Sequence, residues 1–195
     1  MLDGASRVGD MFEAAADAGM PACAITDHGV MYGALEFYKT GSKSGVKPIL
    51  GMEGYLFAPG HRSEKPPQRE NGDKTFHLTL LASDDAGYKN LTKLSSKAWL
   101  EGFHYYPRTD HEILAEHSEG VICLSGCLSA EIPKLIVAGD LAGARRKVAQ
   151  YREVFGDRFY LELQDHGMPE QKRLNEQLLR LAPEIGLPLV VTNDL

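Results

Sequence analysis

The sequence predicts an α/β fold in which a mainly parallel sheet curls into a barrel surrounded by helices. Short apolar segments typical of buried strands alternate with segments of helical periodicity, which is the pattern of repeated βα units. Polar side chains follow several of these strands at their carboxyl ends, where the active sites of such barrels lie. The sequence has no Gly-x-Gly-x-x-Gly or phosphate-loop lysine motif, which would mark the switch point of a doubly wound sheet.

Three strands are predicted in the first half of the chain. Ser6 is a suitable N-cap for a helix that precedes the first strand, and Gly19 follows the end of that helix. Residues 58–74 combine prolines, glycines and charges with almost no apolar side chains, so we expect a mobile surface loop there. The predicted strands are residues 20–26, 47–53 and 75–81, and a second helix begins at residue 34 and breaks within residues 41–45.

The second half continues the alternation of helices and strands. Ser83 is the predicted cap of a helix that extends to about Trp99, and residues 101–108 are predicted to form a loop. The remaining predicted helices are residues 111–117, 129–138, 140–155 and 174–185, and the remaining strands are 121–127, 158–166 and 189–195.

Composition and charge limit the classes of protein to consider. At 195 residues and 43% hydrophobic content, the chain can form one compact domain. A net charge of −6 argues against a surface that coats nucleic acids, because non-specific binding depends on Lys and Arg. Three cysteines without a Cys-x-x-Cys motif suit a reducing compartment, and neither a signal peptide nor a membrane-spanning apolar run is visible. We therefore expect a cytoplasmic protein with no membrane contact.

The polar residues at the strand ends are candidate metal ligands. They are Asp27-His28, Glu53, Cys127, Asp165-His166 and Asn193-Asp194. Imidazole and thiolate groups favour zinc, while carboxylates also admit manganese or iron. Two or more such ions can polarise a phosphoryl group and activate water, so phosphoester hydrolysis is the predicted reaction class.

Each candidate also has a purely structural interpretation. A single His or Glu after a strand is more often a cap or a salt-bridge residue than a ligand, and only the repetition at several strand ends argues otherwise. Cys127 alone is more often a small buried side chain, and Cys23 is predicted to be one. His77 is a weak candidate on periodicity alone, because it lies near the start of its strand. The residues assigned to the surface are His61, His104, His111, His117 and Arg145-Arg146-Lys147.

Several motifs together resemble one known family. The chain is similar to the PHP (polymerase and histidinol phosphatase) domain at the start of the alpha subunit of bacterial replicative DNA polymerase III. The resemblance extends over essentially all 195 residues. The motifs that carry it are Leu2-Asp3-Gly4-Ala5, Ala24-Ile25-Thr26-Asp27-His28-Gly29, Tyr32-Gly33-Ala34-Leu35-Glu36-Phe37-Tyr38, Lys47-Pro48-Ile49-Leu50-Gly51-Met52-Glu53 and Leu124-Ser125-Gly126-Cys127.

The resemblance implies a distorted (β/α)₇ TIM-like barrel with a ring of metal ligands. Two or three divalent ions are implied, with zinc favoured and manganese, magnesium or iron as alternatives. Asp27 is expected to support His28, whereas Asp165 and His166 either support the ligands or cap their strand. Three further ligands are expected outside residues 1–195, so that the barrel is incomplete at both ends. The ligands that match the family are Asp3, His28, Glu53, His77, Cys127 and Asp194.

The resemblance also implies a role in DNA replication. PHP domains with intact ligands are associated with 3′→5′ exonuclease proofreading, in which activated water attacks the terminal phosphodiester of a primer strand. The expected partners are the DNA 3′ end, the other domains of a DNA-directed DNA polymerase (a nucleotidyltransferase), and replicase subunits such as the sliding clamp. Two alternatives remain: a metal-free structural or interaction module, and a stand-alone phosphatase such as histidinol-phosphate phosphatase. Residues 1–195 alone are expected to bind metal weakly and to have no nuclease activity.

Overall fold

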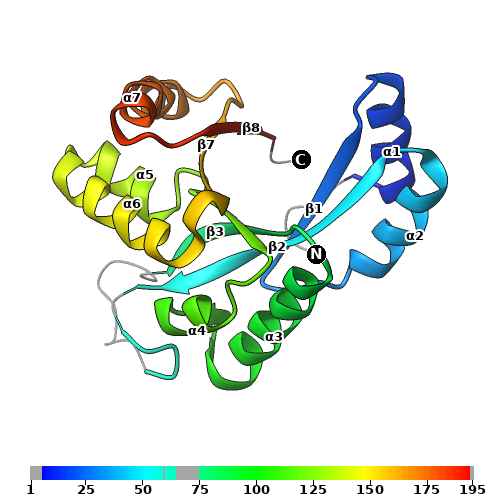
Figure 1. The fold of residues 1–195 in the computed structure, drawn as a ribbon, viewed down its shortest axis with the longest axis horizontal. Coiled ribbons are helices and arrows are strands. Elements are labelled where there is room, and N and C mark those ends of the chain that lie inside the picture. The colour runs from blue at the N-terminus through cyan, green and yellow to red at the C-terminus, as the bar shows by residue number, and fades with distance from the viewer. Residues whose placement is uncertain (1–5, 59, 65–74, 194–195) are drawn as a thin grey trace.

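The fold is built on one curled sheet of eight strands, seen in the computed structural model of the chain (Figure 1). The structure describes residues 6–58, 60–64 and 75–193. The strand order is β4-β5-β2-β3-β6-β7-β8, and β1 also pairs with β2. The strands are β1 (Ala22–His28), β2 (Lys47–Phe57), β3 (Thr75–Ala82), β4 (Phe103–His104), β5 (Tyr106–Thr109), β6 (Val121–Leu124), β7 (Phe159–Gln164) and β8 (Leu189–Thr192). Over the described residues this sheet is a half-barrel, and the predicted α/β barrel-like class is confirmed.

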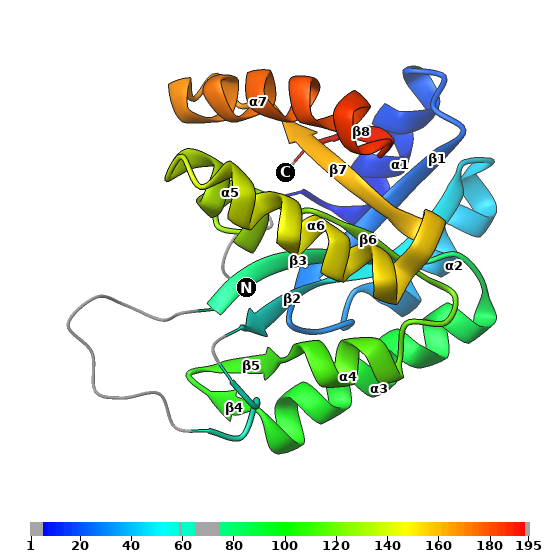
Figure 2. The ribbon, with the colours of Figure 1, turned by 60° about the vertical axis from the view of Figure 1, so that its left-hand side comes forward.

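Helices surround the sheet on its outer side. In Figure 1, α1 and α2 lie beside β1 and β2, and in Figure 2 α5, α6 and α7 lie along β6, β7 and β8 while α3 and α4 flank the β4–β5 hairpin. The described helices are α1 (Val8–Asp17), α2 (Ala34–Ser44), α3 (Asp85–Glu101), α4 (His111–Glu116), α5 (Glu131–Val137), α6 (Leu141–Phe155) and α7 (Pro169–Ile185). None of the described helices is long and apolar enough to cross a membrane.

Two apolar clusters join the helices to the sheet. The larger cluster fills the space between the sheet and the helices from α3 onward, with Leu80 and Leu161 fully buried at its centre. The smaller cluster lies between α1 and α2, where the rings of Phe12 and Phe37 are 4.6 Å apart. Burial of these side chains provides the main stabilising free energy of the fold and fixes the positions of the strand ends.

One strand runs in the direction opposite to that expected from βα units. β3 is antiparallel to both of its neighbours, β2 and β6, whereas β1 pairs with β2, and β6 with β7, in parallel. The 17 residues between Phe57 and Thr75 are numerous enough for a parallel crossover, but their proline-, glycine- and charge-rich sequence does not predict the helix of a βα unit, and β3 returns in the antiparallel direction. Consequently, the start of β3 lies at the same edge of the sheet as the ends of β1 and β2.

Several predicted element boundaries were wrong. β2 continues for four residues beyond Glu53, and α2 continues through Gly41, whose missing side chain leaves room for the ring of Phe12. Asp84, not Ser83, caps α3 by accepting a hydrogen bond from the Gly87 N–H at 2.8 Å. Ser6 does not cap α1 either, because the N-cap position is Arg7. The predicted loop at residues 101–108 contains the β4–β5 hairpin.

Only part of the predicted surface loop at residues 58–74 is described. Within residues 60–64, the Arg62 side chain is 9% exposed and donates hydrogen bonds to Asp110 and Glu101. The buried guanidinium of Arg108 donates to the backbone oxygens of Arg62 and Glu64. These contacts hold this end of the segment against α3 and α4. Residues 59 and 65–74, which carry most of the prediction, lie outside the described residues.

Candidate metal centre

The register of β1 and β2 brings the first two candidate ligands together. His28, the last residue of β1, is paired with Glu53 of β2, and its Nδ1 atom lies 3.5 Å from Glu53 Oε2. Gly29 follows with φ of +65°, and a Cβ at this position would be 2.5 Å from the Pro107 side chain. A glycine therefore allows the chain to turn sharply past β5 while His28 remains at the strand end.

His77 joins this pair from the opposite strand direction. It is paired with Tyr55 of β2, and its Nδ1 atom forms a short contact with Glu53 Oε1. Glu53 therefore lies between two imidazoles, with one carboxylate oxygen directed to each. The antiparallel direction of β3 explains why a histidine near the start of a strand reaches a site formed by the ends of its neighbours.

Cys127 completes the described group from the loop after β6. Its Sγ atom is 3.7 Å from His77 Nδ1. The preceding residue, Gly126, has φ of +80°, and a Cβ there would be 2.7 Å from Ala130 and 2.9 Å from the backbone oxygen of His77. Only glycine fits this close approach, which places the thiol beside the histidine.

The electrostatics of the cluster favour a positive charge at its centre. Hydrogen bonds with Cys127 and with the Glu53 carboxylate raise the pKa of His77 to about 10, although burial opposes this shift. His77 is consequently protonated at neutral pH when no metal is bound. Its proton lies between a carboxylate oxygen and a sulfur atom, both of which are ligands of divalent cations.

The donor set fits a divalent cation. His28, Glu53 and His77 can each offer one atom, and these atoms lie within 4.8 Å of one another. Together with the thiol of Cys127 they provide nitrogen, oxygen and sulfur, the combination typical of zinc sites. The side chains of His28, Glu53 and His77 are 22%, 13% and 28% exposed, so a substrate could reach an ion held between them.

The other predicted site residues differ in what the structure shows of them. Asp3 and Asp194, the remaining predicted ligands, lie outside the described residues. Asp27 was expected to support His28, but adjacent strand residues face opposite sides of the sheet, and its carboxylate accepts the Gly33 N–H at 2.7 Å. It therefore supports the turn that leads into α2.

Asp165 and His166 lie in the exposed turn after β7. Asp165 accepts a hydrogen bond from the Gly167 N–H at 3.0 Å. This contact agrees with the second of the two roles expected for Asp165, capping the end of its strand. The ring of His166 contacts the Gln171 side chain at 2.8 Å, so it is linked to the start of α7.

The residues assigned to the surface are not all exposed. The side chains of His111 and His117 are 25% and 15% exposed, and His111 lies against the Tyr151 ring and 3.5 Å from Glu131. Lys147 pairs with the same Glu131 at 2.8 Å. Helical position alone did not reveal these packing contacts.

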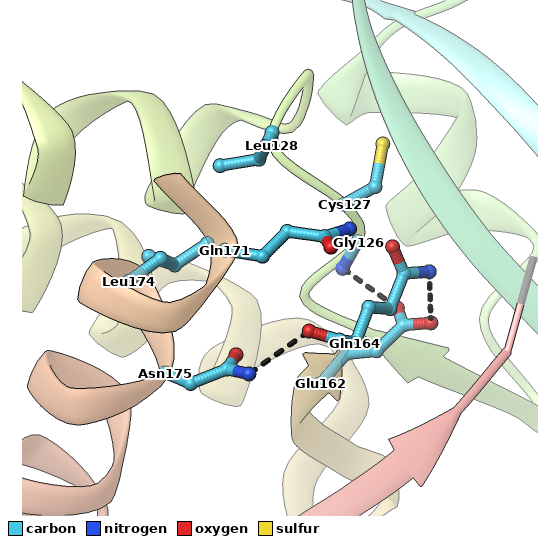
Figure 3. A pocket seen from close by; sticks show the side chains of 8 residues that line it. All are labelled: Gly126, Cys127, Leu128, Glu162, Gln164, Gln171, Leu174 and Asn175. Atoms are coloured by element: carbon cyan, nitrogen blue, oxygen red, sulfur yellow. Dashed lines mark hydrogen bonds between the residues drawn. The ribbon is translucent and has the colours of Figure 1, made fainter. Parts of the chain in front are cut away.

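Sequence reasoning missed Glu162, a buried carboxylate directly behind the cluster. It is 3% exposed and lies in the apolar run of β7. In Figure 3 its carboxylate accepts a hydrogen bond from the backbone of Gly126, while the side chain of Cys127 points away from it. Glu162 also borders a small cavity with Gln164, Gln171 and Asn175. The sequence feature that could have identified Glu162 is the presence of a charged residue between Leu161 and Leu163.

Aromatic side chains lie beside the ligands. The Tyr55 ring is 5.4 Å from His77 and 4.8 Å from Tyr106, measured between ring centroids. Trp99 donates its indole N–H to the Gly29 oxygen at 3.0 Å and stacks on Phe103 with centroids 5.1 Å apart. Trp99, Phe103 and Tyr106 are 42%, 55% and 38% exposed. These three residues, which we call the aromatic surface, are connected to the cluster through Gly29 and through Tyr55.

A second group of ligand-type side chains lies near the start of α4. Ligand atoms of His61, Asp110 and Glu112 also fall within 4.8 Å of one another. Here, however, Arg62 donates to Asp110 through its guanidinium at 3.1 Å and through its backbone N–H at 2.8 Å. Burial disfavours the Asp110 anion, but hydrogen bonds from Ile113 and Arg62 outweigh it and lower the pKa of Asp110. The Arg62 guanidinium therefore already neutralises the negative charge of Asp110 in this second group.

Comparisons with known proteins identify one matching family. The family described as "PHP domain" matches residues 1–166. The chain is 47% identical to the DNA polymerase III subunit alpha of Thermus aquaticus and 45% identical to that of Treponema pallidum, covering all of the chain but 16% of each relative. It therefore spans about a sixth of the length of these relatives.

Solved structures show the same fold at low sequence identity. A protein described as a metal-dependent phosphoesterase from Bifidobacterium adolescentis has a TM-score of 0.55 and 16% identity, covering 98% of this chain and 82% of that one. An amidohydrolase from Chromobacterium violaceum has a TM-score of 0.57 and 13% identity, covering 98% and 83%.

Proposed function

Because this chain belongs to the PHP domain family, we propose that it is the metal-dependent phosphoesterase domain of a bacterial DNA polymerase III alpha subunit. In that role it removes nucleotides from the 3′ end of a primer strand as a proofreading exonuclease. The observation that carries the proposal is the convergence of His28, Glu53, His77 and Cys127 at one edge of the sheet.

The chain's own residues would hold two or three divalent ions, with zinc favoured by the imidazole and thiol donors. Asp3 and Asp194 are the proposed ligands outside the described residues. Such ions, when bound, polarise a phosphoryl group and lower the pKa of water. Glu53 orients both histidines, and the Tyr55 ring packs beside them.

The aromatic surface supports a nucleic-acid substrate. Unpaired bases stack on exposed aromatic rings, and this contact does not depend on a high positive charge. Trp99, Phe103 and Tyr106 are exposed, and Trp99 is hydrogen-bonded to Gly29 directly after the ligand His28, so in this proposal the last bases of the primer stack on these rings. This arrangement accommodates an acidic domain that receives its DNA from the other polymerase domains and from subunits such as the sliding clamp.

A cytoplasmic location completes the proposal. Cys23, Cys123 and Cys127 are all free thiols, as expected in a reducing compartment.

The test is a nuclease assay on the full-length subunit with a single-stranded DNA labelled at its 5′ end. After reconstitution with zinc or manganese, the protein should shorten the DNA from its 3′ end, and chelation should abolish this. Glu53→Gln should lower the rate at least about 100-fold, because the substitution disrupts both histidine contacts and the charge that holds the ions.

Polymerase activity of the same variant provides the control for folding. Unchanged 3′ shortening in Glu53→Gln, or none in the reconstituted wild type, would contradict the proposal and favour a structural module. Hydrolysis of histidinol phosphate instead of DNA would favour the small-molecule phosphatase.

A further inference from the structure

Glu162 connects several parts of the metal centre without belonging to its ligands. Its side chain is buried in β7, and each of its two carboxylate oxygens accepts two hydrogen bonds. Oε2 accepts from Thr79 Oγ1 at 3.2 Å and from the Gly126 N–H at 3.0 Å. Oε1 accepts from Thr192 Oγ1 at 2.5 Å and from Gln164 Nε2 at 3.3 Å.

Three of these donors are close in sequence to metal ligands. Thr79 lies two residues after His77 on the same face of β3. Gly126 directly precedes Cys127, and Thr192 lies two residues before Asp194. One carboxylate therefore joins three separate segments: β3, the loop after β6, and β8.

The chemistry of these contacts is unusual for a residue that only fills the core. All four donors are neutral groups, and burial raises the pKa of Glu162, so its charge is costly to keep there. An ionised carboxylate is an acceptor only, which matches four donors pointing toward it. A neutral side chain could fill the same space at a lower cost in free energy.

We propose that Glu162 is a positioning residue that holds the segments bearing His77, Cys127 and Asp194 at the separation that metal binding requires. The inference rests on the metal site proposed above. Residues that orient ligands from behind typically change metal affinity by 10- to 100-fold when they are removed.

The test is a cobalt(II) titration of the full-length subunit and its Glu162→Ala variant. Cobalt replaces zinc and reports the thiolate of Cys127 through a sulfur-to-cobalt absorption band. Glu162→Ala should lower cobalt affinity 10- to 100-fold and weaken the band. Glu162→Gln, which keeps one acceptor oxygen, should restore part of both.

Asp110→Ala is the matched control. Asp110 is equally buried, at 3% exposed, and also accepts several hydrogen bonds, but it lies outside the metal centre. This variant should lose thermal stability while keeping wild-type cobalt affinity, which separates positioning from general destabilisation.

If circular dichroism shows that Glu162→Ala does not fold, Thr192→Val removes a single donor and should lower affinity about threefold. Wild-type affinity and an unchanged band in the folded variants would overturn the role of Glu162 alone. Absence of cobalt binding to the wild type would overturn the metal site itself, and with it this inference.

Discussion

Two clusters in this molecule contain similar side chains but have different electrostatic environments. His28, Glu53 and His77 gather at the ends of the strands, and His61, Asp110 and Glu112 gather near α4, each with ligand atoms within 4.8 Å. In the second cluster the Arg62 guanidinium neutralises Asp110 from inside the protein. In the first, the positive charge beside Glu53 is a proton on His77. A metal ion can displace a proton but not a covalently attached guanidinium, so the source of positive charge distinguishes the two.

The largest expected effect comes from removing that guanidinium. Arg62→Met leaves Asp110 buried without its cationic partner and should lower the free energy of unfolding by about 3 kcal/mol, measured by urea denaturation. The control is Lys97→Met, which breaks the exposed Lys97–Glu116 pair and should change stability by less than about 1 kcal/mol. If Arg62→Met and Lys97→Met lowered the free energy of unfolding equally, burial would not make the Arg62–Asp110 pair more stabilising than the exposed Lys97–Glu116 pair.

The second largest expected effect is a difference between the two clusters in how they respond to pH. Metal binding must release the His77 proton, so affinity in the full-length subunit should rise about tenfold per unit between pH 6 and 9 from this proton alone. In the metal-free protein, the stabilisation from protonated His77 is complete below its unfolded pKa and is lost as pH rises toward about 10.

Asp110 should respond in the opposite sense. Because its folded pKa is lowered, it contributes stability above its unfolded value, and this contribution is lost as pH falls through the folded pKa. Metal titrations and urea unfolding over the pH range measure both trends. An affinity that does not change with pH would contradict the predicted proton on His77.

The smallest expected effect is that of Glu112→Gln. Its side chain is 65% exposed and lies 3.7 Å from His61, so solvent screens the pair. We expect a change below about 0.5 kcal/mol in unfolding free energy and no change in metal affinity. A measurable loss of metal binding would mean that the second cluster also holds an ion.

The sequence predicted the parts of the centre that depend on local pattern. His28 lies at the end of an apolar strand and precedes Gly29, and Cys127 comes shortly after an apolar strand and follows Gly126. Their positions could therefore be predicted from the sequence pattern. His77 could be identified only through the family resemblance, because hydrophobic periodicity does not reveal the direction of a strand. The structure places it in the cluster because β3 is antiparallel.

Long-range contacts explain what local pattern could not predict. Glu162 is paired with Thr79, 83 residues earlier in the chain, and nothing in β7 alone indicates that partner. Arg62 lies in a segment whose composition predicts a mobile loop, yet Asp110, 48 residues later, binds it. Such pairs form only in the tertiary fold, so the composition of a short segment does not predict them.

The reversed strand also bears on how such a domain can vary. β2 ends at Phe57 and β3 begins at Thr75, its partner in the antiparallel ladder, so the intervening chain leaves and re-enters the sheet at adjacent points. Residues can be added to or removed from such a connection at a small cost in loop-closure entropy and without changing the strand register. Both end points lie on the side of the metal ligands. Changes in the length of residues 65–74, which follow the anchored Arg62 in sequence, should therefore preserve the ligand geometry.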